Sequence, residues 1–240
     1  MTFFINKEKL LEPKLKKIAD NVQKVMEIDR QLLRSDQAVD LIRDLISTGK
    51  LGPGDRVNEA DIANMLGTSR GPVREAIRKL ASTDLLVQEK NIGSKVFSPD
   101  KKFICELFDV REALESLAAR LAAQLMSKQE KAHLIEALDF HEGLMKKPDF
   151  SSYQHGGADW DFHLLILEGA RNQLVWRICG TELGDIFALL RAQHGTSRGQ
   201  QALLEHRWIA AAVKDGNEDL AAALMAQHIR ASRDNLLKKF

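Results

Sequence analysis

A pair of short helical segments joined by a glycine turn constrains the fold of this chain more than any other feature. The first segment covers Asn58 to Leu66, and Asn58 is a residue type that caps helix N-termini. Gly67 follows and suits the left-handed residue that ends a helix. Ser69 then caps a second helix, which the pattern extends to about Thr83. Two short helices joined so closely are typical of a helix-turn-helix motif.

The segments on either side complete a small domain. A helix is predicted from Ser35 to Thr48, and the turn-rich stretch from Gly49 to Asp55 connects it to the motif. After the motif, the runs Leu85 to Lys90 and Lys95 to Ser98 predict the two strands of a β-hairpin. A hairpin in this place is a wing. Residues 35–98 are therefore predicted to form a winged helix-turn-helix domain.

The second helix of the motif carries two different faces. Its apolar stripe follows the spacing i, i+3, i+4, i+7 and consists of Val73, Ala76, Ile77 and Leu80. Its cationic face consists of Arg70, Arg74 and Arg78, with Lys79 beside them. Arginines at this spacing are also common on solvated helix faces. The preceding helix, the turn and the wing are what favour a nucleic-acid surface here.

The start of this helix is suited to enter the major groove of DNA. A helix N-terminus offers partial positive charge and free N–H groups, and an arginine fork matches the O6 and N7 acceptors of guanine. Thr68 and Ser69 can bond phosphates or base edges, and Gly71 lets the backbone approach closely. We therefore expect DNA contacts from this end of the helix and from its arginines.

The net charge of the chain gives no sign of nucleic-acid binding. Residues 35–98 balance nine Lys and Arg against nine Asp and Glu. A DNA-binding surface must therefore be a local patch, such as residues 68–79, where four positive charges face one negative charge.

Other classes of protein are disfavoured. No run of about 18 apolar residues is present, so a membrane span is not expected, and the N-terminus lacks the apolar core of a signal peptide. The two cysteines, Cys105 and Cys179, have no metal-type spacing. Two structural thiols fit a reducing, cytoplasmic location.

Residues 1–34 form a separate N-terminal extension. A helix is predicted over residues 10–33, with an apolar stripe made of Leu11, Leu15, Ile18, Val22 and Val25. The stripe meets Asp29 after about two heptads. A short coiled coil and a helix that packs on the body of the protein both remain open, as does the role of the extension.

Residues 99–240 are helical almost throughout. The helices are predicted over 100–126, 128–146, 154–170, 172–194, 200–214 and 217–237. Short connections between them predict an all-α bundle. The fold class is thus mainly α, with a winged helix-turn-helix domain followed by a helical bundle.

Three histidines and one aspartate can converge inside this bundle. Asp159 and His163 are four residues apart and share a helix face that continues with apolar residues. His206 lies ten residues before the turn at Gly216, and His228 lies twelve residues after it. In an antiparallel hairpin both rings would lie roughly 15 to 18 Å from the turn. Such a set can bind a divalent metal with open positions, although a histidine on an apolar face is more often a hydrogen-bonded core residue.

The first domain resembles the DNA-binding domain of GntR-type regulators. The resemblance covers about residues 36–97, and its most specific part is the string TSRGPVREA at residues 68–76. It implies that Arg70 and Arg74 contact bases or phosphates and that the wing, from Lys90 to Gly93, lies at the minor groove. Asp84 and Asn91 stand where the family usually has glycine, and both residue types tolerate left-handed backbone.

The second domain, from about residue 100 to 235, resembles the FadR-type C-terminal domain, FCD. The matching stretches are Asp109 to Glu115, Asp159 to His163, and Glu205-His206 followed by His228. The resemblance implies that Asp159, His163, His206 and His228 bind zinc, nickel or a similar ion. FadR itself senses an acyl-CoA without such a site, so the complete set argues against that subtype.

The same resemblance implies an effector site beside the metal. Arg111 matches an arginine that faces the cavity, where it would pair with one oxygen of a small organic acid while the metal takes the other. The alternative for Arg111 is a surface ion pair with Glu115 on its own helix. Asn172 is a further candidate for binding the effector. The remaining histidines, His133, His141, His155 and His194, are expected to be surface or structural.

These features together predict a ligand-responsive transcription regulator that is not an enzyme. A homodimer would bind a pseudo-palindromic operator in double-stranded DNA, and repression is the commoner outcome in such regulators. Two alternatives use the same His and Asp residues. A metal-dependent hydrolase or lyase would need a partner base, and Asp161 should point elsewhere on its helix. A direct metal sensor would respond to the ion alone.

Overall fold

A computed structural model describes residues 33–89, 93–147, 152–194 and 198–240. For residues 152–160, 193 and 194 it describes the backbone only. The helix predicted over residues 10–33, the wing residues Lys90 and Asn91, and the side chains of His155, Asp159 and His194 lie outside the described part.

The chain divides into two compact units, which are described separately. The described residues of the first unit are 33–42 and 58–80, and those of the second are 43–57, 81–89, 93–147, 152–194 and 198–240. The domain boundaries expected near residues 34 and 98 stay predictions. None of the described helices is long and apolar enough to cross a membrane.

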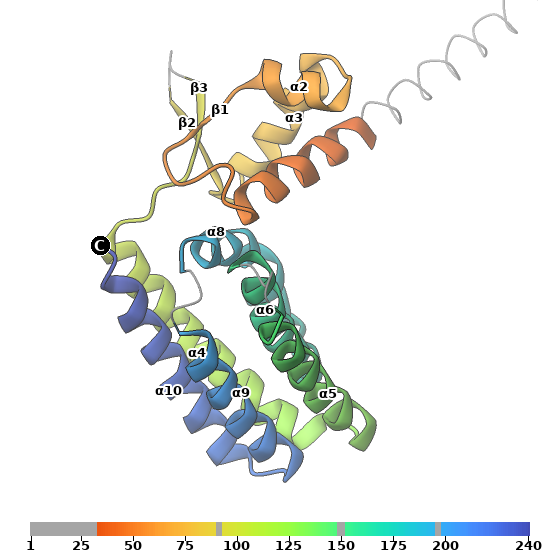
Figure 1. Ribbon diagram of the computed structural model, residues 1–240, viewed down its shortest axis with the longest axis vertical. Coiled ribbons are helices and arrows are strands. Elements are labelled where there is room, and N and C mark those ends of the chain that lie inside the picture. The colour runs from red at the N-terminus through yellow and green to blue at the C-terminus, as the bar shows by residue number, and fades with distance from the viewer. Residues whose placement is uncertain (1–32, 90–92, 148–151, 195–197) are drawn as a thin grey trace, which may run out of the picture. The chain divides into compact units, whose positions relative to one another are not determined.

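The helix-turn-helix motif forms as its end signals predict. α2 covers Glu59–Leu66, and the Asn58 side chain accepts a hydrogen bond from the Ala60 N–H at 2.9 Å. Gly67 is left-handed, with φ 59°, and its N–H caps the carbonyls of Ala63 and Asn64. α3 covers Arg70–Ala81, so it starts directly after Ser69, as predicted, and ends two residues short of the predicted end (Figure 1).

The core face of α3 is the predicted apolar stripe. Val73, Ala76, Ile77 and Leu80 are all at most 2% exposed. Pro72 is also buried in the first turn, where its missing N–H costs no helical hydrogen bond. Residues 33–47 are helical, which confirms the helix predicted before the motif.

A small antiparallel sheet contains three strands, ordered β1-β3-β2. β1 is Arg56–Val57, β2 is Leu86–Glu89 and β3 is Gly93–Val96. Leu86 pairs with Val96, and Glu89 pairs with Gly93. The second predicted strand was placed two residues too late. β1 was missed because two residues within a turn-rich connector leave no periodic pattern. Asp84 has φ 57°, so it adopts the left-handed backbone expected at that position.

The bundle begins with three long helices, and the first two have identifiable N-caps. α4 covers Lys101–Leu125 and is capped by Asp100, whose side chain accepts from the Phe103 N–H at 2.7 Å. α5 covers Lys128–Met145 and begins with a capping box between Ser127 and Glu130. α6 covers Ser152–Gly169.

The predicted helix 172–194 is in fact three elements. α7 covers Gln173–Val175, the π-helix η1 covers Trp176–Glu182, and α8 covers Gly184–His194. The apolar spacing of this stretch allows a continuous helix, and a change from α to π hydrogen bonding has no signature in residue type. The prediction of one helix was therefore wrong in detail.

The last two helices form the hairpin that the sequence predicts. α9 covers Gly199–Lys214 and α10 covers Glu218–Leu237, with Gly216 left-handed at φ 71° in the turn. α10 lies beside α4 and α9, and α6 packs against α4 (Figure 1). Three helices of the bundle carry the histidines of the predicted metal site: His163 lies on α6, His206 on α9 and His228 on α10.

Candidate functional site

The predicted DNA-reading residues lie mostly on the exposed side of their unit. Ser69, Arg70, Gly71, Arg74 and Arg78 are exposed, and Thr68 is half-buried. Arg74 Nε lies 2.8 Å from Glu59 Oε2, and Arg78 lies 3.5 Å from Glu75. Both pairs are exposed, so they contribute little to stability and leave the arginines able to change partner. Gly93 is exposed at the start of β3.

Three histidines of the bundle form one buried cluster. His163 comes from α6, His206 from α9 and His228 from α10, and each is at most 2% exposed. Their nearest nitrogen atoms all lie within 4.8 Å of one another. The Phe162 ring stacks on His206 at 4.1 Å between centroids, which fixes that imidazole from the α6 side. The structure thus brings together three of the four predicted metal ligands. The fourth, Asp159, has only its backbone described, on α6.

The spacing of two imidazoles fits a shared ion. His206 Nε2 and His228 Nε2 are 3.2 Å apart. Two nitrogen ligands on a tetrahedral zinc ion, each at about 2.0–2.1 Å, would be roughly 3.3 Å apart. The donor set also fits, because imidazole nitrogen is a preferred ligand of zinc and nickel. His163, His206 and His228 can therefore hold a metal ion.

A buried carboxylate that the sequence did not single out lies behind His163. Glu115 on α4 is 1% exposed, and its Oε2 lies 2.5 Å from His163 Nδ1. Its Oε1 accepts a hydrogen bond from Arg111 Nε. The alternative expected for Arg111, a surface ion pair with Glu115, is corrected in one respect. The pair forms, but inside the bundle, where Glu115 also contacts His163.

A second carboxylate lies behind His228. Glu205 on α9 places Oε2 2.7 Å from His228 Nδ1, and the same oxygen accepts from Arg198 at 2.5 Å. Gln201 Nε2 donates to the other oxygen, Oε1, at 3.1 Å. Glu205 appeared in the sequence only as the neighbour of His206. Its position one residue before a histidine gives no sign that it contacts a different histidine on the next helix.

Both carboxylates are held in the charged form. Burial raises the pKa of Glu115, but the charges of Arg111 and His163 and their hydrogen bonds outweigh it and lower the pKa from 4.5 to about 2. Burial likewise raises the pKa of Glu205, and the hydrogen bonds from His228 and Gln201 reverse that effect and lower it. The site therefore contains two fixed negative charges next to the histidines.

Arg111 lies between two aromatic rings in the interior. Its guanidinium carbon is 4.9 Å from the Phe187 ring centroid and 5.4 Å from that of Phe108. Cys179, on η1, is fully buried, and burial together with the charge of Glu115 raises the pKa of its thiol to about 12. The region around Arg111 is thus lined by α4, η1 and α8.

The other predicted residues lie away from the cluster or have a structural role. Asn172 caps α7, because its Oδ1 accepts from the N–H groups of Leu174 and Val175 at 3.1 and 3.2 Å. Its effector role stays a prediction. His133 is exposed and His141 is buried in α5. Asp161 is exposed, which agrees with the expectation that it points elsewhere.

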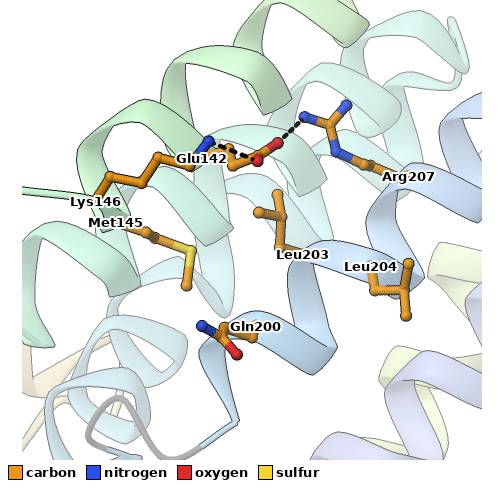
Figure 2. A pocket seen from close by; sticks show the side chains of 7 residues that line it. All are labelled: Glu142, Met145, Lys146, Gln200, Leu203, Leu204 and Arg207. Atoms are coloured by element: carbon orange, nitrogen blue, oxygen red, sulfur yellow. Dashed lines mark hydrogen bonds and ion pairs between the residues drawn. The ribbon is translucent and has the colours of Figure 1, made fainter.

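A separate groove lies on the surface between α5 and α9. The groove has a volume of about 380 Å³. Met145 from α5 and Leu203 from α9 are among the side chains that line it (Figure 2). At one rim, Glu142 pairs with Lys146 at 3.0 Å and with Arg207 at 2.6 Å (Figure 2). The residues that line this groove include no histidine of the cluster.

Solved structures confirm the fold. The chain is similar to the E. coli protein McbR/YncC, with a TM-score of 0.73 and 22% identity over 86% of this chain and 98% of that one. A regulator from Rhodococcus sp. RHA1, described as a putative transcriptional regulator GntR, gives a TM-score of 0.72 at 22% identity over 86% and 99% of the two chains. These similarities support the mainly helical architecture.

Curated relatives are regulators of transcription and not enzymes. The chain is 30% identical over 201 residues, 82% of its length and 86% of the relative's, to a protein of Paenarthrobacter nicotinovorans named as a probable D-xylose utilization operon transcriptional repressor. It is 25% identical over 224 residues, covering 81% and 83% of the two chains, to the putative L-lactate dehydrogenase operon regulatory protein of E. coli. The prediction of a regulator without catalytic activity is confirmed.

Family comparison assigns both parts of the chain. Residues 34–96 match the family of bacterial regulatory proteins, gntR type, and residues 106–231 match the FCD domain. With the helix-turn-helix motif at one end and the histidine cluster at the other, this chain belongs to the GntR family of DNA-binding transcription regulators, in the branch that carries an FCD domain.

Proposed function

We propose that this regulator represses transcription as a homodimer and that a small organic acid, bound at a metal ion in its bundle, controls its affinity for the operator. The buried cluster of His163, His206 and His228 carries this proposal. The ligand atoms already lie at metal-binding spacing, with 3.2 Å between two of them. Zinc and nickel are the ions that suit this donor set best.

The ion would hold one end of the effector. Three imidazoles, with Asp159 as a fourth ligand, leave coordination positions for water or for a carboxylate oxygen. Arg111 is linked to His163 through a single carboxylate, that of Glu115. A second carboxylate, supplied by the effector, would therefore meet both the ion and a guanidinium, which has five N–H donors in a fixed fork.

The name of one relative, a putative L-lactate dehydrogenase operon regulatory protein, supports an organic-acid effector. The name of another, a probable D-xylose utilization operon transcriptional repressor, supports repression. On the DNA side, α3 presents Arg70, Arg74 and Arg78 on its exposed face, and each protomer would place one such helix in a half-site. Binding of the acid would then favour one arrangement of the two DNA readers, which requires different affinity in the two arrangements.

A gel-shift titration tests the proposal. Metal-loaded protein is mixed with the DNA upstream of its own gene, with L-lactate as the first probe and other small mono- and dicarboxylates after it. We expect sequence-selective, salt-sensitive binding that one acid weakens at least tenfold in wild type but not in Arg111→Ala. Loss of selective DNA binding, or an unchanged affinity with every acid, would contradict it.

The same site also fits a direct sensor of the ion, because the cluster is complete without an organic ligand. In that case, adding the metal alone to metal-free protein would switch DNA binding on or off. An effector sensor would instead hold its ion constantly, and its DNA binding would change only when the organic acid is added. The titration therefore includes metal-free protein as a separate arm.

A further inference from the structure

Two of the three clustered histidines each contact a carboxylate that in turn pairs with an arginine. His163 contacts Glu115, which pairs with Arg111, and we call these three residues the inner chain. His228 contacts Glu205, which pairs with Arg198, and we call these three residues the outer chain. In both, a carboxylate meets the imidazole at Nδ1, at 2.5 Å in the inner chain and 2.7 Å in the outer chain.

The carboxylate decides which nitrogen of each ring faces the cluster. A neutral imidazole whose Nδ1–H donates to a carboxylate keeps its lone pair on Nε2. His228 Nε2, which lies 3.2 Å from His206 Nε2, then keeps its lone pair toward the cluster. An ion that enters the cluster would therefore meet two imidazoles, those of His163 and His228, with Nε2 free to bind it.

The arginines explain how such carboxylates can lie so deep. An unpaired carboxylate in the interior would be neutralised by protonation, and each arginine prevents this by supplying the opposite charge. The inner chain is almost sealed, with the side chains of Glu115 and Arg111 1% and 11% exposed. The outer chain lies at the edge of the bundle, with Glu205 and Arg198 13% and 16% exposed.

The two chains also tie different helices to the cluster. The inner chain joins α4 to α6, because Arg111 and Glu115 lie on α4 and His163 lies on α6. The outer chain joins the start of α9 to α10, and Arg198 also donates to Ser232 on α10 at 3.0 Å. Each histidine is therefore oriented by a helix other than its own.

We propose that Glu115 and Glu205 are positioning residues for the ion, and that each fixes the tautomer and orientation of one histidine ligand through an arginine-supported carboxylate. The inference rests on the proposed metal site. It adds that metal affinity depends on two residues that do not touch the ion, and that Arg111 affects the ion even when no organic acid is bound.

The test measures zinc affinity by competition with a chromophoric chelator, using the full-length protein. Glu115→Gln and Glu205→Gln preserve side-chain shape and remove the charged acceptor. We expect each to weaken zinc binding by about 10- to 100-fold. Glu112→Gln is the matched control, because Glu112 lies on the same helix as Glu115 and pairs with exposed Arg230. It should bind zinc as wild type does.

A second readout reports the tautomers directly. In metal-free protein, ¹⁵N NMR of the imidazoles should show His163 and His228 with the proton on Nδ1 in wild type and in Glu112→Gln. His228 should lose this single state in Glu205→Gln. Because Glu205 is partly exposed, this variant keeps the test available if Glu115→Gln does not fold.

The outcomes separate the two proposals. Wild-type protein that binds no ion would contradict the proposed function and this inference together. Wild-type protein that binds zinc, with both variants equal to it in affinity and tautomer, would leave the proposed function standing and overturn the inference. Weaker binding in Glu205→Gln with an altered His228 tautomer, and an unchanged control, would support it.

Discussion

The arginine face of α3 and the histidine cluster of the bundle obtain their properties in opposite ways. On α3 the functional residues lie within about three turns of one helix, and the side chains are exposed. In the cluster, the residues come from three helices, are buried, and depend on partners from a fourth helix, α4. A surface of the first kind depends on local sequence and solvent-screened charge. A site of the second kind depends on packing and on charges that water does not screen.

Loss of two cluster histidines should have the largest effect. Wild type is expected to carry about one metal ion per chain. The double variant His206→Ala with His228→Ala should carry none, because it loses two of the proposed ligands, whose Nε2 atoms lie 3.2 Å apart. Elemental analysis after purification without chelators measures this. His133→Ala, an exposed histidine on α5, is the control and should keep the ion. Equal metal content in all three proteins would show that the ion does not depend on the buried cluster.

Acid should weaken the bundle through Glu115. Its pKa is lowered from 4.5 to about 2 in the fold, so its contribution to the free energy of unfolding is complete above pH 4.5. The contribution is lost as the pH falls through 2, and its full size is about 3 kcal/mol. Denaturant unfolding of metal-free wild type and Glu115→Gln, measured between pH 7 and 2, tests this. The two curves should converge toward low pH, and parallel curves would contradict the assignment.

Removal of one α3 arginine should have an intermediate effect. Arg70→Ala and Arg74→Ala are each expected to weaken operator binding by about 1–3 kcal/mol, and a phosphate contact would also reduce the salt slope by about one. Fluorescence anisotropy at several salt concentrations measures both quantities. Arg120→Ala removes an exposed arginine of the bundle that pairs with Asp219. If Arg120→Ala weakened DNA binding as strongly as the α3 variants do, the prediction that DNA binding depends on a local surface of α3 would be wrong.

The turn before α3 should show the smallest effect. Gly67 has φ 59° and no atom within 4 Å of an added Cβ, so Gly67→Ala adds backbone strain without a clash. We expect a loss of about 1 kcal/mol in the free energy of unfolding. Gly143→Ala, within α5 and equally open, should instead stabilise by about 0.5–1 kcal/mol. Thermal unfolding distinguishes the two, and a shift in the same direction would contradict the role of the left-handed turn.

The same contrast explains what could be predicted from the sequence. Periodicity located α2, α3 and the long helices, because the burial of Val73 or Leu80 depends on neighbours one turn away. Histidine spacing around Gly216 placed His206 and His228 at one level, because a helical hairpin has a known rise per residue. Both inferences use short-range geometry.

The partners of the cluster could not be predicted in this way. Glu115 lies four residues from Arg111 on one helix, a spacing that is most often a surface pair. Only the packing of α4 against α6 places that carboxylate on His163. Glu205 needed the pairing of α9 with α10, and η1 needed a local change of hydrogen bonding with no residue signature.

The state of Cys179 has a practical consequence. A thiol with a pKa of about 12 and no exposed surface is almost never a thiolate at neutral pH, so alkylating reagents and peroxide will react with it slowly. The other cysteine of the chain, Cys105, lies half-exposed on α4, the helix that also carries Arg111 and Glu115. The natural protein therefore accepts a single fluorophore or spin label without engineering, at a position that can report movement of this helix when an ion or an acid binds.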